Sequence, residues 1–182
     1  TLQGFSSGFL SLACTAQANG EVVASAGEDQ IIRLWDVNTE QCIKQLEGHT
    51  SYCWFVAFNR LGNLLASASE DKSIRLWNVE TGQCLKVLQG HGSGVVSVSF
   101  SLNDQMLATG SHDQTVRLWD VGTGQCLKVF QGHSGWTWLT TFSPDGQVLA
   151  STSEDRTIRL WDVQTEECLK VLEGHMSGVV AV

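Results

Sequence analysis

The chain has 182 residues, of which 42% are hydrophobic and 16% are charged, a composition that argues against disorder. Its 19 acidic residues outnumber its 11 basic residues and give a formal net charge of −8, which disfavours binding to nucleic acid and to anionic membrane surfaces. No apolar run approaches the ~20 residues that a membrane-spanning helix requires.

The sequence repeats itself at a fixed interval. The pattern Arg-Leu-Trp-Asp/Asn-Val occurs four times, and its copies are 42 residues apart, with tryptophans at Trp35, Trp77, Trp119 and Trp161. A fixed period of this length is the signature of a repeat architecture, in which each repeat forms one supersecondary unit. The predicted units are residues 4–47, 48–89, 90–131 and 132–173, followed by the start of a further unit at 174–182.

In chain order, the first unit departs from the others. Phe5 stands where the later units have histidine after glycine, and the turn at 15–20 is two residues longer than its counterparts. The second unit serves as the template. Turns rich in Gly, Asn and Asp separate its extended runs, which are 51–58, 64–69, 73–78 and 84–88.

Four short strands joined by short turns predict a four-stranded antiparallel meander, which is one blade of a β-propeller. The third and fourth units repeat the pattern, and no window has useful helical periodicity. The fourth unit adds a Ser-Pro-Asp-Gly turn at 143–146, where proline presets φ and glycine accepts a positive φ. The chain then continues into the first strand of a fifth unit.

Four of the six cysteines, Cys42, Cys84, Cys126 and Cys168, follow the 42-residue period. Equivalent places in successive units should lie farther apart than the ~7 Å limit for a disulfide. The chain contains no Cys-x-x-Cys and no Cys/His cluster with metal-ligand spacing. We therefore expect reduced, packed thiols with a structural role, no metal, and a reducing compartment such as the cytoplasm.

Three elements recur in phase with the tryptophans. They are the Gly-His pairs at 48–49, 90–91, 132–133 and 174–175, aspartates at 29, 71, 113 and 155, and Trp-Asp pairs at 35–36, 119–120 and 161–162, with Trp-Asn at 77–78. With these elements the chain resembles the WD40, or β-transducin-like, repeat family. Its near-identical units also resemble the recently amplified propellers of large bacterial signalling proteins. The resemblance implies an all-β propeller of WD40 type, with four four-stranded antiparallel blades and the first strand of a fifth.

The resemblance also implies a buried hydrogen-bonded tetrad in each blade. The complete sets are His49, Ser67, Asp71 and Trp77; His91, Thr109, Asp113 and Trp119; and His133, Ser151, Asp155 and Trp161. The first unit has only Ser25, Asp29 and Trp35. Because a buried network stabilises only when every member is satisfied, the missing histidine should cost ~1–3 kcal/mol. We expect the first blade to be the least stable.

Each complete set contains Ser or Thr, His and Asp, the residue types of a hydrolase triad. A triad needs an exposed nucleophile and an oxyanion hole, whereas this constellation recurs three times and is expected to be buried. We therefore predict a protein that is not an enzyme, with no catalytic, cofactor-binding or metal-binding residues. The arginines two residues before each tryptophan, such as Arg33, either pair with an acidic neighbour or hold a partner's anion, and their recurrence favours the first role.

Positions at which the repeats disagree are the candidates for partner binding. After the Gly-His pairs stand Tyr52, Trp54, Trp136 and Trp138, and before the tetrad aspartates stand Glu28, Glu70, His112 and Glu154. The resemblance implies that these positions line the top face near the mouth of the central channel. Aromatic rings interleaved with carboxylates suit a protein or peptide with basic side chains. Alternatively, the aromatics pack between first strands and the glutamates are simply solvated.

Four blades cover little more than half of the seven-bladed ring that the resemblance implies, so two apolar blade faces should be exposed. Either the sequence belongs to a longer propeller chain, or two copies pair head to tail into an eight-bladed ring with twofold symmetry. In such a homodimer, residues 174–182 would compete with the partner's residues 4–12. A closed four-bladed monomer is less expected, because its blades would have to splay.

The sequence thus favours a non-catalytic scaffold or sensor propeller that binds proteins on its top face and channel mouth. One alternative is a purely structural repeat segment that forms oligomers. A second is a propeller that binds a small ligand or a glycan, which the aromatics favour although no polar pocket recurs.

Overall fold

The computed structural model describes residues 8–17 and 20–180, which form sixteen β-strands in four sheets. Each sheet is an antiparallel meander of four consecutive strands, which confirms the predicted all-β architecture. No helix in this described part of the chain is long and apolar enough to cross a membrane. Phe5 and the other residues before Gly8 lie outside the described residues.

The four blades follow one another in chain order, with four strands each. Blade 1 contains β1 (Phe9–Gln17), β2 (Gly20–Gly27), β3 (Ile32–Asp36) and β4 (Gln41–Leu46). Blade 2 contains β5 (Cys53–Phe58), β6 (Leu64–Ser69), β7 (Ile74–Asn78) and β8 (Cys84–Leu88). Blade 3 contains β9 (Val95–Phe100), β10 (Met106–Ser111), β11 (Val116–Asp120) and β12 (Cys126–Phe130). Blade 4 contains β13 (Thr137–Phe142), β14 (Val148–Ser153), β15 (Ile158–Asp162) and β16 (Cys168–Leu172).

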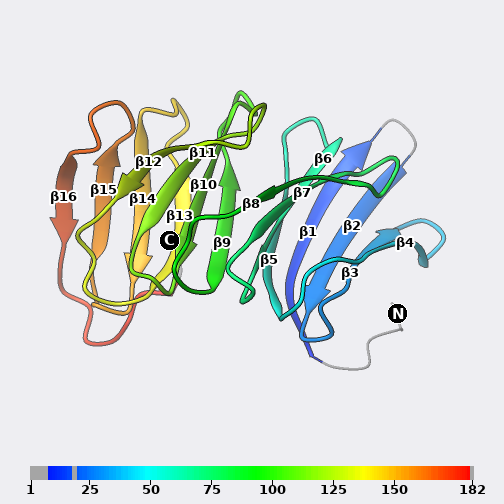
Figure 1. Ribbon diagram of the computed structural model, residues 1–182, viewed down its shortest axis with the longest axis horizontal. Coiled ribbons are helices and arrows are strands. Elements are labelled where there is room, and N and C mark those ends of the chain that lie inside the picture. The colour runs from blue at the N-terminus through cyan, green and yellow to red at the C-terminus, as the bar shows by residue number, and fades with distance from the viewer. Residues whose placement is uncertain (1–7, 18–19, 181–182) are drawn as a thin grey trace.

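The blades follow one another in chain order along an open arc. The first strands contact each other in series, β1 with β5, β5 with β9, and β9 with β13. Figure 1 shows blade 1 and blade 4 at opposite ends of this arc. The described residues therefore form an open arc of four blades.

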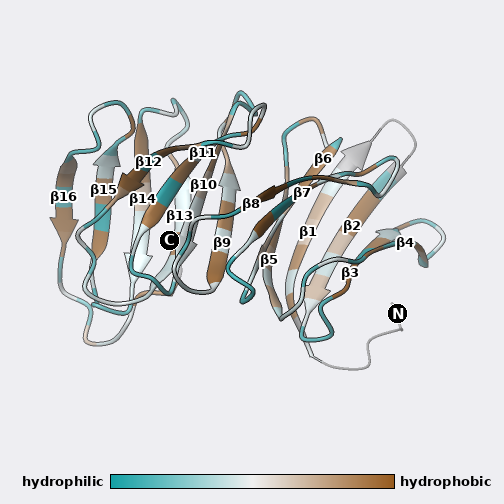
Figure 2. Cartoon of the chain, in the orientation of Figure 1, coloured by the Kyte–Doolittle hydropathy of each residue, from teal (hydrophilic) through white to brown (hydrophobic). Residues whose placement is uncertain are grey.

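The hydrophobic core lies between blades, because successive sheets stack face to face. Leu46 of β4, for example, packs in one buried cluster with Val56, Leu65 and Trp77 of blade 2. Equivalent clusters join blade 2 to blade 3 and blade 3 to blade 4. Apolar residues on the strands, brown in Figure 2, thus serve as contacts to the neighbouring blade.

Every first strand contains a β-bulge at the same place. The residue that the bulge leaves unpaired is Leu10 in β1, Trp54 in β5, Val96 in β9 and Trp138 in β13. A bulge adds one residue to a strand and re-aims its side chain. The two candidate tryptophans Trp54 and Trp138 are therefore the unpaired bulge residues of their strands, where the regular alternation of side chains is interrupted.

The aspartate of the Trp-Asp pair closes the turn from the third strand to the fourth. Asp36 Oδ1 accepts a hydrogen bond from the Thr39 backbone N–H at 2.8 Å. Asn78 accepts the same bond from Thr81 at 2.7 Å, so the Trp-Asn variant preserves the turn. The Thr39 hydrogen bond lowers the pKa of Asp36 from its ordinary value.

The periodic cysteines are not packed, contrary to the expectation from the sequence. Cys42, Cys84, Cys126 and Cys168 are free and exposed. They lie on the outermost strand of each blade, in places that the following blade does not cover. Cys53 is the buried cysteine, and its burial raises the pKa of its thiol to about 12.

Candidate functional site

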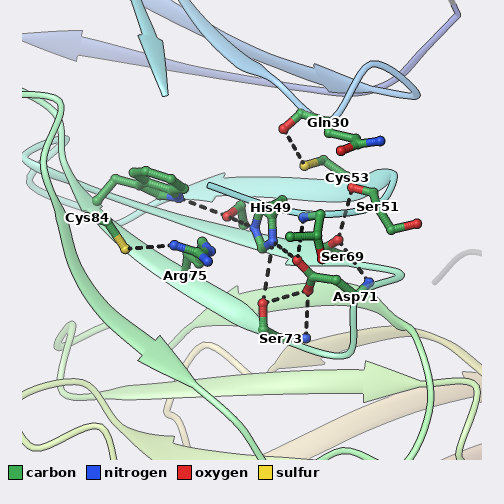
Figure 3. Close-up of polar contacts among 12 residues, drawn as sticks. Gln30, His49, Ser51, Cys53, Ser69, Asp71, Ser73, Arg75 and Cys84 are labelled. Atoms are coloured by element: carbon green, nitrogen blue, oxygen red, sulfur yellow. Dashed lines mark hydrogen bonds and ion pairs between the residues drawn. The ribbon is translucent and has the colours of Figure 1, made fainter. Parts of the chain in front are cut away.

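The tetrad of blade 2 forms a continuous hydrogen-bonded chain (Figure 3). Asp71 Oδ2 lies 2.8 Å from His49 Nδ1, and His49 Nε2 lies 2.7 Å from Ser67 Oγ. The Trp77 indole N–H donates to the same Ser67 oxygen at 2.8 Å. All four groups are satisfied if the imidazole is neutral, with Nδ1–H donating to the carboxylate and the serine hydroxyl donating to Nε2.

Blades 3 and 4 repeat this chain with the same geometry. The histidine–aspartate distances are 2.8 Å in both blades, for His91 with Asp113 and for His133 with Asp155. Burial lowers the pKa of His91 and of His133 from the ordinary value, even though each faces a carboxylate. The neutral imidazole that the hydrogen bonds require is thus also the form that burial favours.

The tetrad aspartates have additional donors that keep them ionised. Asp113 accepts hydrogen bonds from the Gly92 backbone N–H at 2.8 Å and from the Thr115 hydroxyl at 2.6 Å. Burial by itself raises the pKa of Asp113, but the hydrogen bond from His91, its charge interaction and these donors outweigh burial and hold that pKa well below its usual range. The pKa values of Asp71 and Asp155 are lowered in the same way.

The Ser-His-Asp sets have no accessible nucleophile. Ser67, Thr109 and Ser151 are fully buried. Each hydroxyl oxygen also accepts the indole N–H of its tetrad tryptophan at 2.8 or 2.9 Å. A substrate cannot reach these hydroxyls in the folded blade, so the sets hold the strands together and do not form a hydrolytic site.

In blade 1, which lacks the histidine, an arginine contacts the tetrad aspartate. Trp35 still donates to Ser25 at 2.8 Å. Asp29 Oδ2 pairs instead with Arg33 Nη1 at 2.7 Å, and both side chains are nearly buried. Asp29 Oδ2 has no hydrogen-bond partner among the described residues, as expected for a set that lacks its histidine, and the ion pair with Arg33 balances its charge. In blade 2 the equivalent Arg75 directs Nη1 toward Cys84 Sγ at 3.6 Å (Figure 3).

Six of the eight candidate partner-binding residues come together on the top face. This face is the propeller edge formed by the starts of the first strands and by the turns between second and third strands. The six residues, which we call the top-face cluster, are Tyr52, Trp54, Glu70, His112, Trp136 and Trp138. They come from blades 2, 3 and 4, so stacking of the blades creates a site that no single repeat contains.

His112 is the centre of the cluster. Its ring lies against Trp136 with centroids 4.4 Å apart, and it meets Trp138 at 5.5 Å and Trp54 at 6.1 Å. Trp136 and Trp138 are 5.7 Å apart, which closes a continuous aromatic surface. Tyr52 extends this surface beside Trp54 at 6.3 Å.

Glu70 supplies the negative charge of the cluster. Its Oε2 accepts a hydrogen bond from the Trp54 indole N–H at 2.8 Å and lies 3.6 Å from His112 Nδ1. Gly94 makes this placement possible, because a Cβ at that position would collide with the Glu70 carboxylate. The disagreement between repeats pointed to the aromatic positions, but the role of Gly94 depends on contact between blades.

The other two candidates lie apart from these contacts. Glu28 is exposed in blade 1, where its carboxylate lies beside Gly8. Glu154 is exposed in blade 4, and its side chain lies beside Gly178. Both residues form the backbone hydrogen bond that Glu70 also makes to its own first strand. They flank the cluster on the same face without joining it.

The cluster is open to solvent on one side. The side chains of Tyr52 and Trp136 remain 46% and 45% exposed. Half-exposed aromatic faces next to a carboxylate provide cation–π and charge-assisted contacts for a cationic group. Among the described residues, no group of three or more His, Cys, Asp or Glu side chains is arranged to hold a metal ion.

A separate hollow lies along the inner wall of the arc. It has a volume of about 380 Å³ and is lined by β5, β9 and β13, with Phe55, Val98 and Leu139 among its apolar residues and Arg60 and Asp104 at its polar side. Asp104 is engaged there, since it accepts from the Arg60 backbone N–H at 2.9 Å. The sequence reasoning did not identify this hollow, because it is formed between blades.

Comparison with known proteins agrees with this architecture. The pattern described as "WD domain, G-beta repeat" matches the chain at residues 1–36, 40–78, 82–120 and 124–162. A stretch of 37 residues is also 40% identical to the proteins named "Nuclear distribution protein PAC1" of Arthroderma otae, Arthroderma benhamiae and Trichophyton verrucosum. That stretch covers 20% of this chain and only 8% of each relative. The four pattern matches span most of the sequence, and the chain therefore belongs to the WD40 repeat family.

Proposed function

We propose that this chain is a non-catalytic protein-interaction module, a scaffold or sensor, whose partner docks on the top-face cluster. The observation that carries the proposal is the convergence of six side chains from three blades into one partly exposed aromatic surface around Glu70. Large aromatic rings in such surfaces are typical anchors of protein interfaces. The tetrads use their polar groups internally, so they leave the cluster as the candidate for recognition.

The chemistry of the cluster supports a partner with basic side chains. The carboxylate of Glu70 offers a charge-assisted contact, and the exposed rings of Tyr52 and Trp136 offer cation–π contacts. The net charge of −8 attracts a basic partner and repels nucleic acid and anionic lipids. The free, exposed cysteines fit a reducing compartment, so we place this interaction in the cytoplasm.

The test is a binding screen of the chain against an immobilised library of basic, neutral and acidic peptides. We expect capture of basic peptides by the unmodified chain and its loss in the double variant Tyr52→Ala/Trp136→Ala, which should remain folded. Leu61→Ala is the matched control, because Leu61 is an exposed apolar residue away from the cluster. Unfolding of the double variant would instead identify the two aromatics as core residues.

We also propose that the ends of the arc bind further blades, supplied by a second copy of the chain or by additional repeats. Leu172 on β16 is 44% exposed, whereas its counterparts Leu46 and Leu88 are 1% and 2% exposed because the next blade covers them. On blade 1, Leu12 is likewise exposed, whereas its counterpart Val56 is buried. The two open faces therefore carry the two halves of an interface that recurs three times inside the chain.

Mass photometry of the chain alone tests the head-to-tail homodimer. We expect dimers that Leu172→Asp abolishes and that Leu169→Asp preserves, since Leu169 lies on the same strand but its counterparts Leu85 and Leu127 are exposed in every blade. A monomer at all concentrations would rule out the homodimer and leave additional repeats as the covering partner.

A further inference from the structure

His112, in the top-face cluster, departs from the residue that the other blades have at this position. The other three blades have glutamate at this place, namely Glu28, Glu70 and Glu154. All four residues donate the same backbone hydrogen bond to the residue just before their first strand, as His112 N–H does to the Gly94 carbonyl at 2.9 Å. The backbone is thus unchanged, and the substitution alters only the side chain, from an anion to a group that can become a cation.

The imidazole of His112 is held where an outside cation would be expected to bind. Its side chain is only 11% exposed, and indole rings of Trp54, Trp136 and Trp138 surround it. Glu70 Oε2 lies 3.6 Å from Nδ1, while Nε2 is buried and has no hydrogen-bond partner among the described residues. Aromatic faces combined with one carboxylate form the environment that favours a cation.

Glu70 is the ionic partner that the structure gives His112. Trp54 of β5, Trp138 of β13 and Trp136 just before β13 place uncharged rings against it. The next residue, Asp113, is held by His91 at 2.8 Å. Glu154 donates its backbone N–H to the Trp136 carbonyl, and its side chain lies beside Gly178. Protonation of His112 would therefore be balanced mainly by Glu70, the same carboxylate that a basic partner would use.

We propose that protonated His112 takes the place of a partner's cation in the top-face cluster. Its protonation thereby prevents the cluster from binding a partner's lysine or arginine. This inference rests on the proposed function and adds its regulation. The imidazolium would neutralise Glu70 and repel an incoming cation. The neutral imidazole leaves the charge of Glu70 available. Affinity for a basic side chain is therefore higher with the neutral imidazole than with the imidazolium.

The experiment uses three short peptides that share one sequence and differ at a central arginine, lysine or citrulline. Binding is followed at pH 5.5 and pH 8 by the NMR signal of the Trp54 indole N–H, which reports on Glu70. For the arginine and lysine peptides we expect affinity to rise about tenfold from the lower to the higher pH, the order of one charge–charge contact close to water. The neutral citrulline peptide should show no such change.

In the variant His112→Gln, whatever its absolute affinity, the affinities for the arginine peptide at pH 5.5 and at pH 8 should agree to within about twofold. His112→Glu, which installs the residue of the other blades, provides a second variant if the first does not fold. Binding of basic peptides that is independent of pH, or equally pH-dependent in both variants, would overturn the inference and leave the proposed interaction role intact. Absence of any peptide binding would overturn the inference together with the basic partner, while mass photometry still reports on the role in assembly.

Discussion

The interior tetrads and the top-face cluster use the same residue types to different ends. In the tetrad of blade 3, His91 contacts Asp113 at 2.8 Å and Thr109 at 2.8 Å, and Trp119 completes the chain. In the cluster, His112 lies 3.6 Å from Glu70, its Nε2 has no partner in the described part of the chain, and two aromatic side chains are half exposed. The tetrads satisfy all their polar groups internally, whereas the cluster retains contacts that it can offer to another molecule.

The largest effect should separate the two kinds of tryptophan. Trp119→Ala removes a fully buried ring and its hydrogen bond to Thr109, and we expect a loss of ~3–5 kcal/mol in the free energy of unfolding. Trp136→Ala removes a half-exposed ring, and the loss should be about 1 kcal/mol. Urea denaturation of both variants measures the difference. Equal losses would mean that the cluster is as structural as the tetrads.

The next comparison concerns the arginine of blade 1. Arg33→Met leaves Asp29 without its buried cation, which should cost ~3–5 kcal/mol. Arg117→Met is the matched control in blade 3, where His91 already holds the aspartate, and should cost ~1 kcal/mol. Urea denaturation again provides the measurement. A similar cost for both would show that Arg33 contributes packing and not charge.

Stability should fall with acidification, because of the tetrads. The folded pKa values of His91 and His133 are lowered, so the unfolded chain binds protons first and stability decreases below about pH 6.5. The pKa values of Asp71, Asp113 and Asp155 are lowered as well, so their contribution is present above about pH 4 and is lost below it. Melting temperatures measured between pH 8 and pH 3 test this profile.

His91→Gln provides the control for that profile, since it should weaken the first decline and preserve the second. The His91→Gln variant also distinguishes the tetrads from the top-face cluster. The pH dependence of peptide binding between pH 5.5 and 8 should depend on His112 and not on His91. A flat stability profile across this range would contradict the neutral tetrad imidazoles.

The smallest effect on stability should come from Gly94→Ala. The added Cβ meets the end of the flexible Glu70 side chain, which can move, so the cost in stability should be within about 0.5 kcal/mol. The displaced carboxylate should nevertheless leave the Trp54 indole and weaken binding of basic peptides. Gly92→Ala is the control, because its Cβ would make only ordinary contacts with Asp113. Unchanged peptide binding in Gly94→Ala would show that the Glu70 carboxylate does not contribute to binding.

The sequence was sufficient for the blades because the 42-residue period aligns every strand and turn with the tryptophans. The tetrad residues recur with that period, and the resemblance to the WD40 repeat family implied their membership. Pairing with an acidic neighbour was favoured for the recurring arginines; Arg33 makes this pair with Asp29, whereas Arg75 contacts Cys84 in a blade that has the histidine. The exposure of Cys84 and its equivalents was also misjudged, because strand alternation alone does not tell which outer face lacks a neighbour.

The cluster was only partly predictable for a different physical reason. Disagreement between repeats identified Trp54 and Trp136, but their approach to His112 depends on the stacking angle of three blades. Gly94 matters through the side chain of the preceding blade, which no comparison of equivalent positions reveals. Sequence periodicity therefore locates variable positions, and the structure decides which of them meet.

The bulge in each first strand has a consequence for how such a chain can diversify. Leu10, Trp54, Val96 and Trp138 occupy this place in the four blades, yet the strand pairing around them is the same. The backbone therefore tolerates side chains as different as valine and tryptophan at this one position of the blade. Each duplication of this unit in a gene adds one more variable position of this kind. Single substitutions there can change the recognition surface while the strand pairing stays constant.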